Sequence, residues 1–330
     1  MSSRMPTAAE LDEAVRLLED GQLVAFPTET VYGLGADAEN IEAVARIFAA
    51  KGRPSNHPVI VHVVDGADVG YWTDDVPEAA HKLIEAFWPG PLTIILKRAA
   101  HIPAAVAGGQ DSIGLRCPSH PVAQALLSRF KRGRGGIAAP SANKFGQVSP
   151  TTAEHVRDEF GGAVYVLEGD AVDVGIESSI IDLSRLDSVG PVLLRPGAIT
   201  AAMMADVLGV TPLAPDATAP RASGTLKAHY APRTTLTLAQ ADALPQYLHG
   251  LPKDGRLAFV GTTPVSGDAR CEFVEAPATP DAYAQALYGL LRRLDKEGYQ
   301  RLVFEPVPDT HEWDGVRDRL GRAAAAFEDH

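Results

Sequence analysis

Apolar residues in the first two thirds of the chain follow two alternating patterns. Helical spacing predicts helices between Thr7 and Gly21 and at 41–51, 77–88, 121–130 and 152–160. Short apolar runs predict strands at 23–26, 59–63, 92–97, 112–116, 137–139, 164–167, 180–183 and 192–195. Period and length separate the two element types. Their mixture indicates an α/β fold.

The pattern changes after residue 210. Prolines and small residues dominate from about 213 to 235, a composition typical of a linker. The run Lys227 to Tyr230 gives this linker an unusual set of polar side chains, so we expect 223–232 to fold over the first domain as a lid. Strands at 234–238, 256–260 and 302–305 then alternate with helices at 241–249 and 281–297 and a last helix to Phe327. We expect a small α/β domain with a largely parallel sheet.

The stretch from Leu23 to Ala36, LVAFPTETVYGLGA, has the features of a site loop. An apolar strand leads into Pro27, which has no N–H for a ladder, and Thr28, Glu29, Thr30 and Tyr32 then place hydroxyls and a carboxylate after it. The carboxyl end of a strand is where open α/β sheets bind ligands. Gly33 and Gly35 permit positive φ or a close approach of the backbone. A polar turn that caps a helix is the alternative.

Cations recur at the ends of predicted elements. Lys51 and Arg53 flank a glycine at a helix end, and Arg116 and Arg195 each close an apolar strand. An arginine in such a place can bind a carboxylate through two parallel hydrogen bonds. Stabilisation of a helix C-terminus also explains the pair at 51 and 53. A lone strand histidine such as His62 is more often a structural residue than a ligand.

A second polar loop follows the strand at 137–139. It begins Pro140-Ser141-Ala142-Asn143, and Ser149-Pro150 precede a capping box at 151–154. Helix N-termini of this kind bind anions. Together with Glu177-Ser178-Ser179 and Arg195, these loops place hydroxyls and cations after five separate strands, which favours one shared site.

Composition excludes several classes of protein. The net charge of −12 disfavours a protein that grips an extended nucleic-acid backbone, although Arg129, Lys131, Arg132 and Arg134 form a local basic cluster. The two cysteines are far apart without metal-ligand spacing, so neither a zinc site nor a disulfide framework is expected. No apolar run approaches the ~18 residues of a membrane helix, and Walker, GxGxxG and HExxH motifs are absent. We expect a cytoplasmic protein without membrane contact.

An ordered set of motifs resembles the threonylcarbamoyl-AMP synthase family, whose catalytic unit is the YrdC-like domain. The set covers nearly the whole chain and consists of FPTETVYGLG, KGRPSNHPVIVHV, WPGPLT, GLRCPSHP, APSANKFGQVSPT, ESSIIDL, LLRPGAIT and SGTLKAHYAPRT. The resemblance implies a YrdC-like twisted mixed-sheet α/β domain with a central cavity at 1–210, a linker or lid at 211–233, and a small Rossmann-like domain at 234–330. Serines at 119 and 179 replace the usual alanine and threonine.

The resemblance also implies an activity and its residues. The enzyme would condense L-threonine, bicarbonate and ATP, with Mg²⁺, to threonylcarbamoyl-AMP and pyrophosphate, and a separate transferase complex would modify adenosine beside the tRNA anticodon. The family's catalytic residues match Lys51, Arg53, Ser141 and Asn143. Its threonine contacts match Thr30, His62, Arg116, Ala139 and Ser178, and further ATP contacts match His57, Ser112, Ser149, Arg195 and Tyr230. No metal-binding residues are implied, and direct tRNA binding is expected to be weak or absent.

Three alternatives stay open at this point. A YrdC-like domain could bind double-helical RNA without catalysis, which requires a positive surface. It could serve a carbamoyl transferase of hydrogenase maturation, but such proteins carry CxxC zinc fingers and this chain has two isolated cysteines. The C-terminal domain could be a packing partner alone.

Overall fold

The computed structural model describes residues 5–265 and 267–328 and separates into two compact units. The first unit contains the residues up to Phe145 together with Ser149–Thr225. The second contains Gly146–Val148 and the residues from Leu226 onward. The expected linker 211–233 thus contributes to both units. The three-part division expected from the sequence stays a prediction, and each unit is described by itself.

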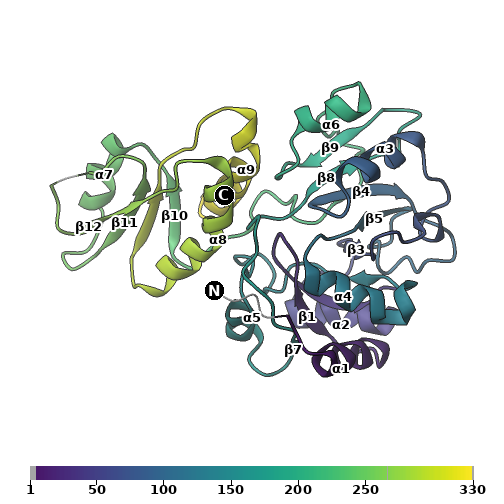
Figure 1. The fold of residues 1–330 in the computed structure, drawn as a ribbon. Helices are drawn as coiled ribbons and strands as arrows, with labels where there is room; N and C mark the ends of the chain where they lie inside the picture. Colours follow the sequence, from purple (N-terminus) through teal and green to yellow (C-terminus); the bar gives the residue numbers. More distant parts are fainter. Residues whose placement is uncertain (1–4, 266, 329–330) are drawn as a thin grey trace. The chain divides into compact units, whose positions relative to one another are not determined.

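The first unit is built on a mixed sheet (Figure 1). The strand order is β7-β1-β2-β6-β3-β5-β4-β8-β9. Pairing is parallel for β1 with β7, β3 with β5 and β4 with β8, and antiparallel elsewhere. The strands are β1 Val24–Pro27, β2 Tyr32–Asp37, β3 Val61–His62, β4 Leu92–Lys97, β5 Ser112–Arg116, β6 Ile137–Ala138, β7 Tyr165–Val166, β8 Ser179–Asp182 and β9 Val192–Arg195.

Helices cover this sheet through two main apolar clusters. One cluster joins Leu18, Phe26 and Leu126, and the other joins Leu34, Ile47 and Leu115. The helices are α1 Ala8–Glu19, α2 Ile41–Lys51, α3 Glu78–Phe87, α4 Pro121–Arg129, α5 Ala153–Phe160 and α6 Ala201–Leu208, with the short 3₁₀ helices η1 Val69–Tyr71 and η2 Phe130–Gly133. Thr7 forms a capping box at the start of α1, and the Asn40 side chain caps α2. The expected box at 151–154 is wrong, because Thr152 caps α5.

The segment expected to be a long loop after Pro27 is a β-hairpin. Pro27 belongs to β1 and lies opposite Tyr32, so only 28–31 form the turn. Gly33 and Gly35 lie within β2, and neither has a positive φ. A Cβ at Gly35 would lie 2.8 Å from both Ile137 Cγ2 and Phe26 Cε1. Glycine is therefore required here by close packing of the sheet's own side chains.

The second unit has a four-stranded sheet whose pairs are all parallel, as expected (Figure 1). Its order is β10-β13-β11-β12. The elements are β10 Thr235–Leu238, β11 Leu257–Gly261, β12 Cys271–Glu275, β13 Arg301–Phe304, α7 Leu244–His249, α8 Pro280–Lys296 and α9 Asp314–Ala325, with η3 Ala241–Ala243 and η4 His311–Trp313. Among the residues described here, no helix combines the length and apolar character needed to span a membrane. Strand β12 and, in the first unit, helix α6 were not expected from the sequence.

Candidate active site

The β1–β2 turn holds a compact hydroxyl pair. Thr28 Oγ1 lies 2.8 Å from Thr30 Oγ1 and donates to the Val31 carbonyl at 2.7 Å. Both threonines are buried. The turn therefore keeps Thr30, a predicted threonine contact, in one fixed position beside the sheet.

His62 and Arg116 are direct neighbours in the ladder between β3 and β5. Residues opposite each other in a ladder project from the same face of the sheet, so the register alone brings these side chains together. Both side chains are buried. Ala139, just after β6, donates its N–H to the Ile60 carbonyl at 2.9 Å and is also buried. Three of the five predicted threonine contacts thus lie on or beside adjacent strands.

Three buried nitrogens of this pair lack a hydrogen-bond partner in the described part of the chain. Within residues 5–265 and 267–328, Arg116 Nε and Nη2 and His62 Nδ1 are buried without a hydrogen-bond partner. Arg116 Nη2 does lie 2.8 Å from Glu29 Oε1, an ion pair outside hydrogen-bond geometry. Buried polar groups without a partner destabilise a fold. A polar ligand with an anionic group would satisfy them.

Burial and the adjacent Arg116 charge lower the pKa of His62 to about 3. In the unfolded chain the imidazole titrates near its ordinary 6.5, so between these values the unfolded state binds the extra proton. Stability therefore falls as the pH falls from 6.5 towards 3. We expect the wild type to lose about 3 kcal/mol more than His62→Asn between pH 6.5 and 4. Urea unfolding at both pH values measures this, and equal losses in the two proteins would contradict it.

Lys51 forms hydrogen bonds with the polar loop that begins at Pro140. Its ammonium donates to the Ser141 carbonyl at 2.6 Å and to the Asn143 carbonyl at 2.5 Å. Burial, and secondly the charge of Arg53, hold the pKa of Lys51 well below its ordinary value. Gly52 adopts the left-handed conformation that ends α2 and turns the chain towards Arg53. The four predicted catalytic residues thus lie around one helix end, and Lys51 is directly bonded to the loop that carries two of them.

Two arginines from distant elements meet at Ser223. Arg53 Nη2 donates to the Ser223 hydroxyl at 3.3 Å, and Arg195 Nη1 donates to the Ser223 carbonyl at 2.7 Å. Arg195 also donates from Nε to the Ser178 carbonyl and from Nη2 to the Ser178 hydroxyl, at 3.0 and 3.1 Å. The Ser178 hydroxyl in turn lies 2.8 Å from that of Thr93. The predicted phosphate-binding arginines are therefore connected to a predicted threonine contact.

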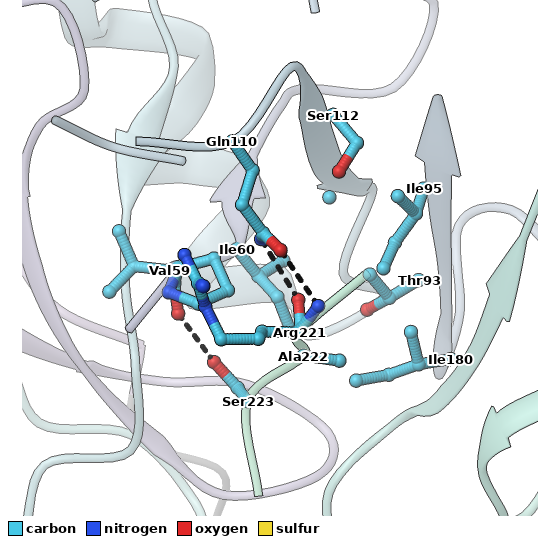
Figure 2. Close-up of a pocket in the computed structure, with 12 residues that line it drawn as sticks. Val59, Ile60, Thr93, Ile95, Gln110, Ser112, Ile180, Arg221, Ala222 and Ser223 are labelled. Atoms are coloured by element: carbon cyan, nitrogen blue, oxygen red, sulfur yellow. Dashed lines mark hydrogen bonds between the residues drawn. The ribbon is translucent and has the colours of Figure 1, made fainter. Parts of the chain in front are cut away.

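The segment 219–225, called the strap below, lines a pocket with Arg221, Ala222 and Ser223 (Figure 2). Gln110 and Arg221 exchange two hydrogen bonds, of 2.7 Å from the Arg221 N–H and 3.1 Å to the Arg221 carbonyl. Beneath the strap lies a cavity of only about 20 Å³, lined by Pro58, Val59, Ile60, Thr93, Ile95, Gln110, Ser112, Gly114, Ile180, Arg221, Ala222 and Ser223. This space is large enough for water but too small for a nucleotide.

The remaining predicted ATP contacts lie in three settings. Ser149 donates to Glu177 at 2.5 Å in a buried pair, and Ser112 lines the cavity beneath the strap. His57 packs edge-on against Phe145, and burial, followed by Arg53 and Arg221, lowers its pKa. Tyr230 belongs to the second unit, where it is buried against Tyr288 and Arg319. Its predicted contact with ATP stays a prediction.

Several polar residues of the site were not assigned from the sequence. Glu29 pairs with Arg116, Glu177 with Ser149, and Gln110 with Arg221. The sequence does place Glu29 in the motif PTET and Glu177 in ESS, so their positions in polar loops were a usable signal. Their partners lie more than 20 residues away, and no local pattern indicates them.

Comparisons with known proteins fit this geometry. A family model described as telomere recombination matches residues 16–197, and one described as threonylcarbamoyl-AMP synthase, C-terminal domain, matches 199–325. A threonylcarbamoyl-AMP synthase of Pyrococcus abyssi is 33% identical over 94% of this chain and 93% of that protein. The chain belongs to the threonylcarbamoyl-AMP synthase family.

Further relatives of the family agree over almost the full length. A threonylcarbamoyl-AMP synthase of Bacillus subtilis is 36% identical over 96% of this chain and 93% of that protein. A crystal structure of Pyrococcus abyssi Sua5 complexed with L-threonine superimposes with a TM-score of 0.86 at 32% identity, covering 97% of this chain and 96% of that one. The fold expected from the resemblance, a mixed-sheet domain followed by a small parallel one, is confirmed.

Proposed function

We propose that this chain is an L-threonylcarbamoyladenylate synthase, a nucleotidyltransferase that condenses L-threonine, bicarbonate or CO₂ and ATP to threonylcarbamoyl-AMP and pyrophosphate. The observation that carries the proposal is the buried pair His62 and Arg116, whose nitrogens His62 Nδ1 and Arg116 Nε and Nη2 have no hydrogen-bond partner among the described residues. The name of the Pyrococcus relative and its solved complex with L-threonine support the choice of substrate.

The residues fit the steps that this reaction needs. The neutral threonine amine first attacks the bicarbonate carbon; one C–O bond breaks, water leaves, and a carbamate forms. A carbamate oxygen then bonds to the α-phosphorus of ATP while the bond to the departing pyrophosphate breaks. Negative charge grows on phosphate oxygens in this step, so positioning and fixed cations supply the catalysis.

We assign Arg53 and Arg195 to the phosphates and Arg116 to the threonine carboxylate. Thr30, His62, Ser178 and the backbone at Ala139 would hold the rest of the amino acid. His57, Ser112, Ser141, Asn143, Ser149 and Tyr230 would contact the nucleotide. Lys51 would act on the phosphates through the loop that it fastens, because its ammonium is bonded to the carbonyls of Ser141 and Asn143.

Mg²⁺ would enter as the complex with ATP. Among the described residues there is no group of three or more His, Cys, Asp or Glu side chains placed to hold a metal ion. We therefore assign no residue to the ion.

ATP and the strap would compete for the same two arginines. Ser223 occupies both Arg53 and Arg195, so phosphate oxygens would replace the Ser223 hydroxyl and carbonyl as acceptors. We propose that the segment from Ser223 to Pro232 moves and then orders over bound ATP. Protease cleavage of this segment that is indifferent to ATP and threonine would contradict a lid.

The product would pass to a separate tRNA-modifying transferase complex in the cytoplasm, with weak or no direct binding of tRNA by this chain. The acyl-phosphate anhydride of the product is hydrolysed readily, so handover to a partner is chemically reasonable. The net charge of −12 supports the absence of a strong tRNA interaction.

The test is direct. The purified full chain is mixed with ATP, Mg²⁺, L-threonine and bicarbonate, and the products are separated and weighed by mass spectrometry. We expect AMP carrying threonine plus one carbonyl, together with pyrophosphate. Reactions without threonine or without bicarbonate are the controls. Pyrophosphate release that does not depend on threonine would overturn the proposal.

A further inference from the structure

We propose that Glu29 binds the ammonium group of the amino acid substrate and thereby selects α-amino acids over other carboxylic acids. The inference rests on the proposed function, because it concerns the substrate whose carboxylate we assign to Arg116. It adds a residue and a specificity to that site.

The two oxygens of the Glu29 carboxylate differ in their hydrogen bonding. Oε2 accepts the Ser119 backbone N–H at 3.1 Å, and the Glu29 carbonyl accepts the Val174 N–H at 2.8 Å. Oε1 is buried, and among the described residues no donor meets it in hydrogen-bond geometry. The side chain is 5% exposed. Such an oxygen retains its capacity for a charged N–H donor.

The buried atoms of this site that lack a hydrogen-bond partner among the described residues include donors of a cation and an acceptor of an anion. Arg116 offers buried donors at Nε and Nη2, and Glu29 offers an acceptor at Oε1, which lies 2.8 Å from Nη2. A simple carboxylate would satisfy the donors but would bring no hydrogen-bond donor to Oε1. A zwitterion, with its carboxylate and ammonium on one carbon, would satisfy both. Leaving a buried group unpaired is the main penalty in such discrimination.

The ion pair also matches the substrate in charge. Glu29 and Arg116 together carry no net charge, and neither does an α-amino acid at neutral pH. A binding site with one buried cation alone would attract any anion of suitable size, including inorganic phosphate. The paired arrangement disfavours such ligands, since a second anion beside Glu29 would be repelled.

A second role for Glu29 is separable by experiment. The carboxylate could serve only to balance and hold Arg116, in which case it acts on the substrate's carboxylate alone. Ligands with and without the ammonium group would then respond equally to its removal. The two roles are therefore distinguished by the ratio of the affinities for a ligand with and a ligand without the ammonium group. A loss of affinity for threonine alone does not distinguish them.

Calorimetric binding to the wild-type full chain is compared for L-threonine and for its 2-hydroxy analogue of the same configuration, in which OH replaces NH₃⁺. We expect the wild type to prefer threonine by roughly 10- to 100-fold, the value of a hydrogen bond to a charged group. In Glu29→Gln, threonine affinity should fall by about that factor, while the analogue changes by less than about threefold. Glu29→Asp should recover part of the preference.

Asp182→Asn is the matched control. Asp182 is a buried carboxylate paired with Arg185 at 3.1 Å on strand β8, and no role in the site is assigned to it. Its loss should leave the preference for threonine unchanged.

Each outcome has a distinct meaning. Equal loss for both ligands in Glu29→Gln, or no loss for either, would overturn the ammonium contact and leave the proposed function standing. If Glu29→Gln does not fold, the two affinities of the wild-type protein provide the test. Equal affinity for threonine and the analogue would itself overturn the proposal. Failure of the wild type to bind threonine would overturn both this inference and the proposed function.

Discussion

Arg116→Ala is expected to lower kcat/KM for threonine by roughly 1,000-fold, because truncating one partner of a buried charge pair costs about 2–5 kcal/mol. The guanidinium is buried on β5, where Nε and Nη2 find no hydrogen-bond partner among the described residues and Nη2 forms an ion pair with Glu29. Its removal takes away the N–H donors for the substrate carboxylate and leaves Glu29 without its counter-ion. Steady-state kinetics with threonine varied at saturating ATP measure the effect, which should appear mainly in KM for threonine.

Two variants make this result specific. Arg116→Lys keeps the charge but loses the planar fork, so it should recover only part of the activity. Arg185→Ala removes another partly buried arginine that is paired with Asp182, and it should change KM for threonine little. An unchanged KM for threonine in Arg116→Ala, with the fold intact by circular dichroism, would remove Arg116 from the site.

Arg53→Ala is expected to lower turnover at least ~100-fold while the fold stays intact, on the scale of one preorganised transition-state contact. Arg53 follows the end of α2, and its Nη2 meets the Pro58 carbonyl at 2.9 Å and Ser223 in the strap. Its charge is therefore held where we place the phosphates. Pyrophosphate release under saturating substrates reports kcat.

The control lies on the same helix. Arg46 of α2 donates to the Gly21 carbonyl at 2.5 Å, away from the strap, and Arg46→Ala should retain normal kcat. Near-normal turnover in Arg53→Ala would refute its role. Equal losses in both variants would indicate damage to α2 as the cause.

The regular elements were largely predictable from the sequence. The strands Leu92–Lys97 and Ser112–Arg116 occur at the expected residues, because their apolar pattern is strong and their ends are marked by turn residues. Helix α6 was missed since its sequence, AAMMADVL, is apolar nearly throughout and shows little periodicity. Strand β12 was missed because CEFVE is a short edge strand with two glutamates. The hairpin was misjudged because proline and glycine usually indicate a loop.

The site was predictable in its residue types and not in its pairings. Strand-end positions indicated Arg116 and Arg195, and the family motifs indicated Lys51 and Arg53. The bonds of Lys51 to the carbonyls of 141 and 143, and the contact of both arginines with Ser223, depend on segments 28 to 170 residues apart. Such contacts follow from tertiary packing, which local periodicity does not encode.

The ladder that places His62 opposite Arg116 has a practical consequence for protein engineering. Hydrogen bonds between β3 and β5 set the separation of these two side chains. The length of the chain between the two strands therefore does not affect this separation. Gly66 is one exposed position in that intervening chain, and no heavy atom lies within 4 Å of a Cβ added there. Peptide tags or reporter labels inserted around Gly66 should leave the spacing of His62 and Arg116 intact.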